Sequence, residues 1–264
     1  MGGWLGALAL ATTLLLALDA PAVAGCSRPI AVPIAPSGRL AFVGADEQVL
    51  GVYPDLLRQL GSRIGCHFHI TAMPRARLEM EFNAGRHADL LISATRTPER
   101  DRSGEFVPLF RQPLVIVTRN AGKAPVVPDN RAALVQGDWR MAVQRSFHFS
   151  PEYRSLVAEL EAAGRVDPVN DLDAAARMLR AARVDFALMS PPQAQAIAGA
   201  DLVFRRFEGL PLMEVGLYLS RTSLGGPERA LLKEALGRAA REGLVRQAFL
   251  HHYPPQVVEL NLPL

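Results

Sequence analysis

The 264-residue chain contains little lysine, little cysteine and few aromatic residues. Lys123 and Lys233 are the only lysines among 29 basic residues, and arginine supplies the rest. No block of basic residues with interleaved aromatic side chains occurs, so nothing supports nucleic-acid binding. The formal net charge is +3, and removal of an N-terminal leader that contains Asp19 would raise it by one.

The sequence also lacks the common signatures of catalytic and metal sites. No G-x-S-x-G, H-E-x-x-H or P-loop pattern is present. His67 and His69 lie two residues apart, and His251 and His252 are adjacent, but neither pair completes a set of metal ligands. We therefore expect neither a metal nor a cofactor.

The N-terminus carries the one long apolar run of the sequence. Leu5 to Leu18 has the length of the hydrophobic part of a signal peptide and is too short to span a bilayer comfortably. Ala22-Val-Ala24 supplies a small-x-small cleavage site before Gly25, although the residues ahead of the run contain no Lys or Arg. We expect residues 1–24 to be a signal peptide and the mature protein to be soluble in the periplasm.

The two cysteines allow two interpretations. Val23-Ala-Gly25-Cys26 matches a lipobox, in which Cys26 would carry a lipid anchor. Alternatively, Cys26 and Cys66 each come just before an apolar strand, and in adjacent parallel strands their Cα atoms would lie ~5–6 Å apart, within disulfide range. We favour the disulfide, because a lipid anchor would leave an unpaired Cys66 in an exported protein.

Predicted strands and helices alternate along the first part of the chain. The predicted strands are 30–34, 68–71 and 90–94, and the predicted helices are 53–64 and 76–84. This alternation predicts an α/β fold with mostly parallel sheets flanked by helices. A buried strand at 114–118 leaves this lobe, and a strand at 215–219 returns to it.

A second α/β unit fills the region between these two crossing strands. Its predicted elements are strand 140–144, a helix that begins near Ser150-Pro151, helix 172–180 and strand 186–189. Helices 227–242 and 244–252 complete the first lobe. We therefore expect a first lobe of residues 25–113 and 215–264 and a second lobe of residues 114–214.

The stretch between residues 72 and 108 carries most of the functional signal. Asp89 opens the apolar strand Leu90–Ile92, and the strand ends in Ser93, Thr95 and Thr97 before Pro98-Glu99-Arg100. Ligands of α/β sheets bind at the carboxyl ends of the strands. Hydroxyl groups, an arginine and a new helix N-terminus at such an end favour an anionic ligand.

The order of these motifs resembles the type II periplasmic solute-binding proteins of polar-amino-acid ABC importers, the bacterial extracellular solute-binding protein family 3. Besides the stretch just described, three other motifs carry the resemblance: Gly51-Val-Tyr-Pro-Asp55, Leu179-Arg-Ala-Ala-Arg-Val-Asp185 and Gly243-Leu-Val-Arg-Gln-Ala-Phe249. They resemble the family's first helix, a unit of its second lobe and its closing helix.

This resemblance implies a two-lobe binding protein without catalytic activity. Such a protein captures a small anionic or amino-acid-like solute between its lobes and, as a monomer, delivers it to an inner-membrane ABC permease. Two alternatives remain open. One is a ligand-sensing module of a membrane receptor. The other is a dehydratase or lyase on the same fold, for which Glu79 and Glu81 are the nearest acid–base candidates.

The resemblance also implies the residues of the first-lobe site. Arg100 would bind a ligand carboxylate bidentately, through two parallel N–H···O hydrogen bonds from its guanidinium group. Its alternative is a surface ion pair with Glu99 or Asp101. Ser93 and Thr95 would add donors at the end of the strand, or would simply cap it.

Further candidates come from the helix that follows Pro74 and from the second lobe. Of Arg75 and Arg77 in this helix, at least one should face the cleft, and we select Arg77. Arg96 is a further candidate, and the alternative for each of the three is a solvated position. From the second lobe, the turn with Ser146 and Phe147 would contact the ligand, although Phe147 could instead belong to the core.

Two departures from the family pattern concern the ligand. A carboxylate that holds the ligand ammonium is expected where the chain has Ser190, and a stacking aromatic residue is expected where it has Ser37-Gly38-Arg39. Glu208, Glu214 or Asp171 could replace the carboxylate. Without such a replacement, ordinary α-amino acids should bind weakly, because a buried ammonium needs a charged partner.

Overall fold

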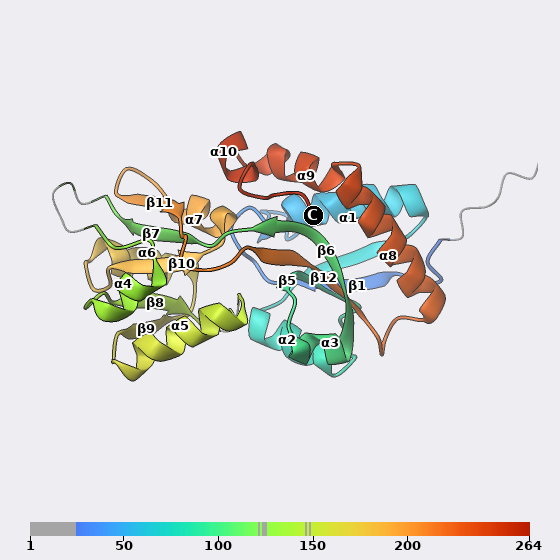
Figure 1. Ribbon diagram of the computed structural model, residues 1–264. Coiled ribbons are helices and arrows are strands. Elements are labelled where there is room, and N and C mark those ends of the chain that lie inside the picture. Colours follow the sequence, from blue (N-terminus) through green and yellow to red (C-terminus); the bar gives the residue numbers. More distant parts are fainter. Residues whose placement is uncertain (1–24, 121, 123–125, 146, 148) are drawn as a thin grey trace, which may run out of the picture.

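The computed structural model describes residues 25–264 except 121, 123–125, 146 and 148. Within these residues the chain forms two lobes that are joined by two extended crossings (Figure 1). The predicted signal peptide and the candidate Ser146 lie outside the described residues. In the part of the chain that is described, no helix has both the length and the apolar character needed to cross a membrane.

The first lobe is built from strands near both ends of the chain. β1 (Ile30–Ile34) and β4 (Phe68–Ala72) pair in parallel, and β5 (Leu90–Thr95), β12 (Met213–Ser220) and β6 (Gly104–Gln112) form an antiparallel sheet with β12 in the middle. A short hairpin adds β2 (Phe42–Val43) and β3 (Val49–Leu50). The helices of this lobe are α1 (Val52–Ile64), α2 (Arg75–Asn83), α3 (Pro98–Ser103), α8 (Gly226–Arg241), α9 (Leu244–His252) and α10 (Pro255–Val258).

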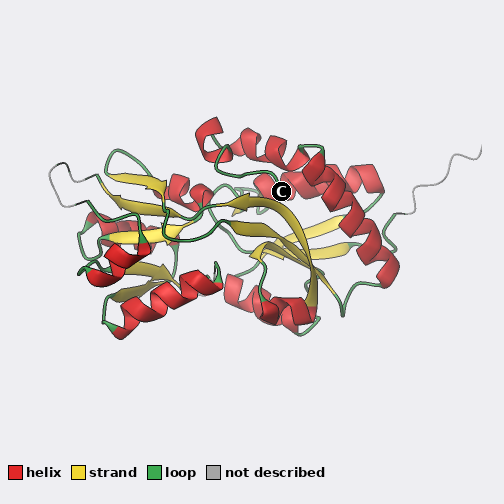
Figure 2. Ribbon diagram, viewed as in Figure 1, coloured by secondary structure: helices red, strands yellow, loops and turns green. Residues whose placement is uncertain are grey.

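The second lobe has one five-stranded sheet with helices on both faces (Figure 2). The strand order is β11 (Leu202–Arg206), β7 (Val115–Arg119), β10 (Phe186–Met189), β8 (Met141–Gln144) and β9 (Val166–Val169). The helices are α4 (Arg131–Gln136), α5 (Pro151–Ala162), α6 (Leu172–Arg180) and α7 (Pro191–Ile197). As expected from the sequence, Ser150 caps α5, and its hydroxyl accepts the Tyr153 N–H at 3.1 Å.

The two-lobe α/β fold is confirmed, but the sheets are mixed rather than mostly parallel. β12 runs antiparallel to both of its neighbours in the first lobe, and β7 does the same in the second. Each is the strand with which the chain enters its lobe after a crossing, so it comes from the opposite direction to the α/β units there. Strands β6, β9 and β11 were not predicted, because their charged residues and prolines break up the apolar pattern.

Alternating side chains bury both faces of the second-lobe sheet. Val115 and Val117 of β7 pack in the same cluster as Leu179 of α6, whereas Ile116 points to the other face and clusters with Leu156 of α5. In the first lobe, one larger cluster joins the strands to α1, α8 and α9.

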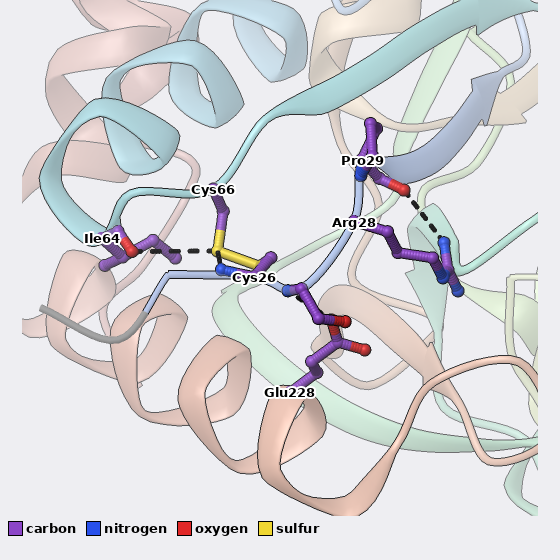
Figure 3. Close-up of a disulfide and its surroundings, with 7 residues drawn as sticks. Cys26, Arg28, Pro29, Ile64, Cys66 and Glu228 are labelled. Atoms are coloured by element: carbon purple, nitrogen blue, oxygen red, sulfur yellow. Dashed lines mark hydrogen bonds between the residues drawn. A yellow bond between two sulfur atoms is a disulfide. The ribbon is translucent and has the colours of Figure 1, made fainter.

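The predicted disulfide is present in the first lobe. Cys26 and Cys66 are bonded, with their Cα atoms 4.8 Å apart, at the start of the parallel pair in which Ile30 lies opposite Phe68 (Figure 3). The backbone N–H of Cys26 also points at the Cys66 sulfur, at 3.1 Å. The bond closes the chain around helix α1 and fixes the beginning of β1.

An ion pair holds the same N-terminal segment to the start of β5. Both terminal nitrogens of Arg28 contact the carboxylate of Asp89, at 2.7 and 2.8 Å, and this carboxylate also accepts the Ala31 N–H at 2.8 Å. Burial disfavours the charged form of Asp89, but its hydrogen bonds to Arg28 and Ala31 outweigh that cost and keep the pKa of Asp89 below its usual value. Asp89 is therefore a structural anchor.

Candidate functional site

A pocket lies between the lobes, at the carboxyl end of β5. The cavity that it leaves for water-sized molecules has a volume of about 50 Å³. The described residues that line the pocket from the first lobe are Leu40, Tyr53, Arg75, Ser93, Thr95, Arg100, Phe110, Gln112, Val215 and Phe249. Those from the second lobe are Phe147, Phe149, Ser190, Pro192 and Gln193.

The lobes touch on two sides of this pocket. On one side, Gln193 of α7 lies 3.4 Å from the Ser37 hydroxyl of the first lobe. On the other, Arg154 of α5 forms an exposed ion pair with Glu99 of α3 at 3.9 Å. The small volume and these two contacts describe a cleft in which the lobes have come together.

Gly38 of the first lobe lies close to helix α7 of the second lobe. Its φ angle is +53°, and a Cβ atom added there would lie 2.9 Å from the Cβ of Ala196 in α7. A side chain at this position would push the lobes apart. The absence of the family's stacking aromatic residue here therefore has a steric reason.

Arg100 lines the pocket, and its guanidinium is held against Glu79. The residue is 6% exposed, and its Nη2 lies 2.6 Å from Oε1 of Glu79, while Nη1 donates to the Thr95 carbonyl at 2.9 Å. Thr97 begins α3 by accepting the Arg100 N–H at 3.3 Å. The alternative of a surface ion pair with Glu99 or Asp101 is not what the structure has.

Arg75 is the second arginine of the pocket, and it too contacts Glu79. Its Nε and Nη2 lie 3.0 and 2.9 Å from Oε1 of Glu79, and its Nη1 donates to the Ile92 carbonyl at 3.0 Å. Arg77, which we had selected, has a side chain that is 64% exposed and lies 3.9 Å from Glu81. It is not among the lining residues.

Helical spacing explains this difference. Leu78 and Phe82 form the buried face of α2, and Arg75 and Glu79 lie on that same face at spacings of three and four residues. Arg77 lies on the other side of the helix. Arg96 is also exposed, and it pairs with Asp101 at 3.1 Å outside the pocket.

The charges at the site are unequal. Two guanidinium groups share the single carboxylate of Glu79, so one positive charge is in excess. Burial disfavours the charged form of Glu79, but the two arginines outweigh it and lower its pKa, so this carboxylate is ionised at neutral pH. Among the described lining residues there is no Asp, Glu or His. Such a site is suited to binding an anion.

Ser93 has a backbone conformation that turns the end of β5 toward the pocket. Its φ angle is +54°, and the pairing with β12 passes from Ile92 to Ala94, so that Ser93 is the extra residue of a β-bulge. Its side chain hydrogen-bonds the Tyr53 hydroxyl, whose pKa burial raises to about 12. Ser93 and Tyr53 are therefore neutral polar groups at neutral pH.

Thr95, Phe147 and Ser190, which were also predicted, lie at the pocket. Thr95 supplies the carbonyl that Arg100 holds, and Phe147 lies with its ring centroid 6.1 Å from that of Phe149. Ser190 begins α7, and its hydroxyl lies 2.9 Å from Oε1 of Gln193. Phe147 is thus a half-buried wall residue rather than part of the core.

None of the three acidic residues that were considered as replacements for the missing carboxylate reaches the pocket. Glu208 pairs with Arg206 at 3.0 Å, Asp171 caps α6 by accepting the Ala174 N–H at 2.7 Å, and Glu214 is exposed on β12. A ligand ammonium would find no carboxylate among the described residues that line the site.

Several pocket residues were not identified from the sequence, notably Tyr53, Gln112, Phe149 and Phe249. Gln112 is 5% exposed, and its Oε1 is a buried acceptor without a hydrogen bond. It lies at the end of β6, a strand that was not predicted, so its position could not be inferred. Tyr53 had a signal, since it lies in the first turn of α1, two residues after Gly51, where φ is +123°.

No group of three or more His, Cys, Asp or Glu side chains suited to a metal ion occurs in the described part of the chain. The model of the bacterial extracellular solute-binding proteins, family 3, matches residues 35–163. Residues 35–163 of the chain are therefore similar to this family. The matched segment includes α1, the whole Arg75–Glu79–Arg100 cluster and helix α5. Comparison with curated protein sequences finds no match.

Solved structures with the same fold include proteins of several kinds. A putative L-cystine ABC transporter protein from Listeria monocytogenes has a TM-score of 0.69 at 15% identity, covering 87% of this chain and 97% of that one. A histidine kinase sensor domain similar to periplasmic binding proteins has 0.68 at 18%, covering 85% and 96%. The ancestral amino-acid-binding protein AncCDT-1, a precursor of cyclohexadienyl dehydratase, has 0.67 at 16%, covering 84% and 95%. At these identities the likeness shows the fold alone.

Proposed function

We propose that this protein is a periplasmic solute-binding protein that captures a small carboxylate between its lobes and delivers it to an inner-membrane ABC permease. The observation that carries the proposal is the pair Arg75 and Arg100, which share the one carboxylate of Glu79 at the end of β5. The uncompensated positive charge is costly beside the apolar walls of the pocket, and an anionic ligand would remove that cost.

The walls of the pocket favour a ligand with an apolar body. Phe110, Phe147, Phe149 and Phe249 surround the site, together with uncharged polar groups such as that of Gln112. A carboxylate without an α-ammonium group matches this lining better than a zwitterionic amino acid does. The unpaired Gln112 acceptor would select a ligand with one hydrogen-bond donor on its body.

Ligand capture would occur by hinge motion. The two crossings between the lobes are the only described covalent links between them, and the lobes touch through small contacts beside the pocket. Ligand held between the lobes would stabilise the closed form of the monomeric protein. The membrane permease would then bind this closed form.

A thermal-shift screen tests the proposed ligand class. Carboxylates that bind the native state raise its stability by RT ln(1 + [L]/Kd), so a ligand present at about a hundredfold its Kd adds about 2.7 kcal/mol. We expect monocarboxylates to stabilise the protein and the twenty amino acids to do so weakly. Micromolar or tighter calorimetric binding of a neutral or basic amino acid would refute the proposed ligand class.

A second function, a ligand sensor, is favoured by the similarity to a histidine kinase sensor domain. Deleting the gene separates the two roles. Loss of ligand uptake by the cells indicates an importer, whereas intact uptake with a lost transcriptional response indicates a sensor.

An acid–base enzyme is the weaker alternative. A general acid needs a carboxyl group that stays protonated near neutral pH. Glu79 has a lowered pKa and is held by two arginines, so it is suited to orienting cations rather than to donating a proton.

A further inference from the structure

Glu79 lies behind the pocket and controls both arginines without lining the pocket itself. It follows Arg75 by one turn of α2, and its side chain is 22% exposed. Its Oε1 accepts from Arg75 and from Arg100, and its Oε2 lies 3.3 Å from Nε of Arg100. One carboxylate therefore fixes the orientation of two pocket cations.

The two guanidinium groups are held in the same way. Each turns its Nε and Nη2 toward Glu79 and its Nη1 toward a carbonyl of β5, that of Ile92 for Arg75 and that of Thr95 for Arg100. Both groups still line the pocket. The arginines are thus preorganised, and little side-chain entropy remains to be lost when a ligand binds.

The charge count determines which ligand completes the site. With Glu79 ionised, the cluster carries one net positive charge. A neutral ligand would leave that charge uncompensated, and a dianion would leave a negative charge in surroundings of Phe110, Phe147 and Phe149. Only a ligand with one negative charge balances the site, and an imbalance of either sign costs free energy in a low-dielectric pocket.

We infer that Glu79 is the specificity-determining residue that sets the ligand charge at one, so that the protein selects monocarboxylates over dicarboxylates of the same length. This inference rests on the proposed function, because it assumes that a carboxylate binds at Arg75 and Arg100. Glu79 acts through the arginines and is a positioning residue, since it does not itself line the pocket.

The variant Glu79→Gln tests the inference by removing the charge while nearly preserving the shape of the side chain. Calorimetry with pentanoate and glutarate, and with longer and shorter pairs of the same kind, gives the ratio of affinities for one and two carboxylates. We expect the wild-type protein to prefer the monocarboxylate by about tenfold or more, and Glu79→Gln to shift the ratio toward the dicarboxylate by at least about tenfold.

Glu81→Gln is the matched control. Glu81 lies on the same helix, contacts Arg77 and Arg86 at 3.9 Å, and is not among the lining residues. Its substitution should leave the ratio unchanged. A merely structural role of Glu79 would weaken both ligands in parallel, so the ratio separates specificity from stability.

The outcomes distinguish the inference from the function on which it rests. If no carboxylate binds the wild-type protein, the proposed function is refuted and the inference falls with it. If monocarboxylates bind but Glu79→Gln leaves the ratio unchanged, or if the wild-type protein prefers dicarboxylates, the role of Glu79 is refuted and the function stands.

A second variant keeps the test decisive if Glu79→Gln does not fold. Arg75→Gln removes one positive charge and leaves Glu79 paired with Arg100 alone, so the cluster becomes neutral. We expect this variant to bind pentanoate and its amide, pentanamide, with similar affinity, whereas the wild-type protein prefers the acid. An undiminished preference for the acid in Arg75→Gln would overturn the charge count.

Discussion

Two carboxylates, buried Asp89 and partly buried Glu79, lie near opposite ends of strand β5, and they differ in how their charge is balanced. Asp89, just before the strand, meets one arginine, Arg28, and one backbone N–H. Glu79, beyond the far end, meets two arginines, Arg75 and Arg100. Both carboxyl groups have lowered pKa values. The Arg28–Asp89 pair is electrically neutral, whereas the cluster of Glu79 with two arginines carries one excess positive charge.

This difference separates a structural anchor from a binding site on the same strand. At the Asp89 end, the disulfide ties the N-terminal segment to the start of β4, and the complete ion pair ties it to the start of β5. At the Glu79 end, the excess charge faces a pocket with aromatic walls. Changes at the first end should therefore alter stability and leave affinity intact, whereas changes at the second should alter affinity most.

The largest expected effect on stability comes from the disulfide at the anchor end. Replacing Cys26 and Cys66 together by Ala frees the chain around α1, and the chain-entropy model for a loop of this length predicts a loss of about 4 kcal/mol. Urea unfolding of the variant and the wild-type protein measures the loss. Affinity for a bound monocarboxylate should stay within about twofold, and a large fall in affinity would show that the two ends are coupled.

The next effect is on binding, at the cleft end. Arg100→Ala removes the excess charge and should lower the affinity for a monocarboxylate by about a hundredfold or more, near 3 kcal/mol. The variant should also lose some stability, because Arg100 is buried and holds Glu79 and the Thr95 carbonyl. Calorimetry and urea unfolding measure the two effects, with exposed Arg96→Ala as the control. Unchanged affinity in Arg100→Ala would exclude Arg100 from the site.

A smaller effect is expected for Asp89→Asn. The substitution leaves the Arg28 guanidinium without its anion and weakens hydrogen bonds to a charged group, which contribute about 1.5–3 kcal/mol each. Because Arg28 is nearly half exposed, we expect a loss near the lower end of that range. Urea unfolding checks it, and an affinity change as large as that of Arg100→Ala would contradict the division between anchor and site.

The smallest effect concerns pH. A carboxyl group with a lowered pKa in the folded state adds stability above its unfolded pKa of about 4, and that stability is lost as the pH falls through the folded value. Both Glu79 and Asp89 have this sign. We therefore expect stability to be nearly level from neutral pH to about 5 and to fall below about 4, less steeply in Asp89→Asn. A stability that rises on acidification would contradict both assignments.

The sequence predicted the anchor end more completely than the site. Apolar strands directly after Cys26 and Cys66 predicted the parallel pair and the disulfide, because local patterns determine both. The strand-end motif likewise predicted Ser93, Thr95 and Arg100 at the pocket. The partner of Arg100 was not predicted, because Glu79 on α2 and Arg100 on α3 meet only through the packing of two helices.

The position of Arg75 at the pocket could have been predicted from helical spacing. The apolar residues Leu78 and Phe82 mark the inward face of α2, and that face includes Arg75 and excludes Arg77. Gln112 is a different case. It lies on β6, whose pairing with β12 joins residues a hundred positions apart in the chain, and no local pattern contains that information.

The most direct test of the central claim compares two ligands that differ only in an α-ammonium group. Isothermal titration calorimetry of the wild-type protein measures the affinities for the tightest-binding monocarboxylate of a screen and for its 2-amino derivative. The ratio of the two affinities shows how much the lack of a carboxylate partner for the ammonium group weakens binding. An excess of one positive charge predicts that the plain acid binds at least about tenfold more tightly. Tighter binding of the amino acid would contradict the account, because it would require an anionic group at the site beyond Glu79.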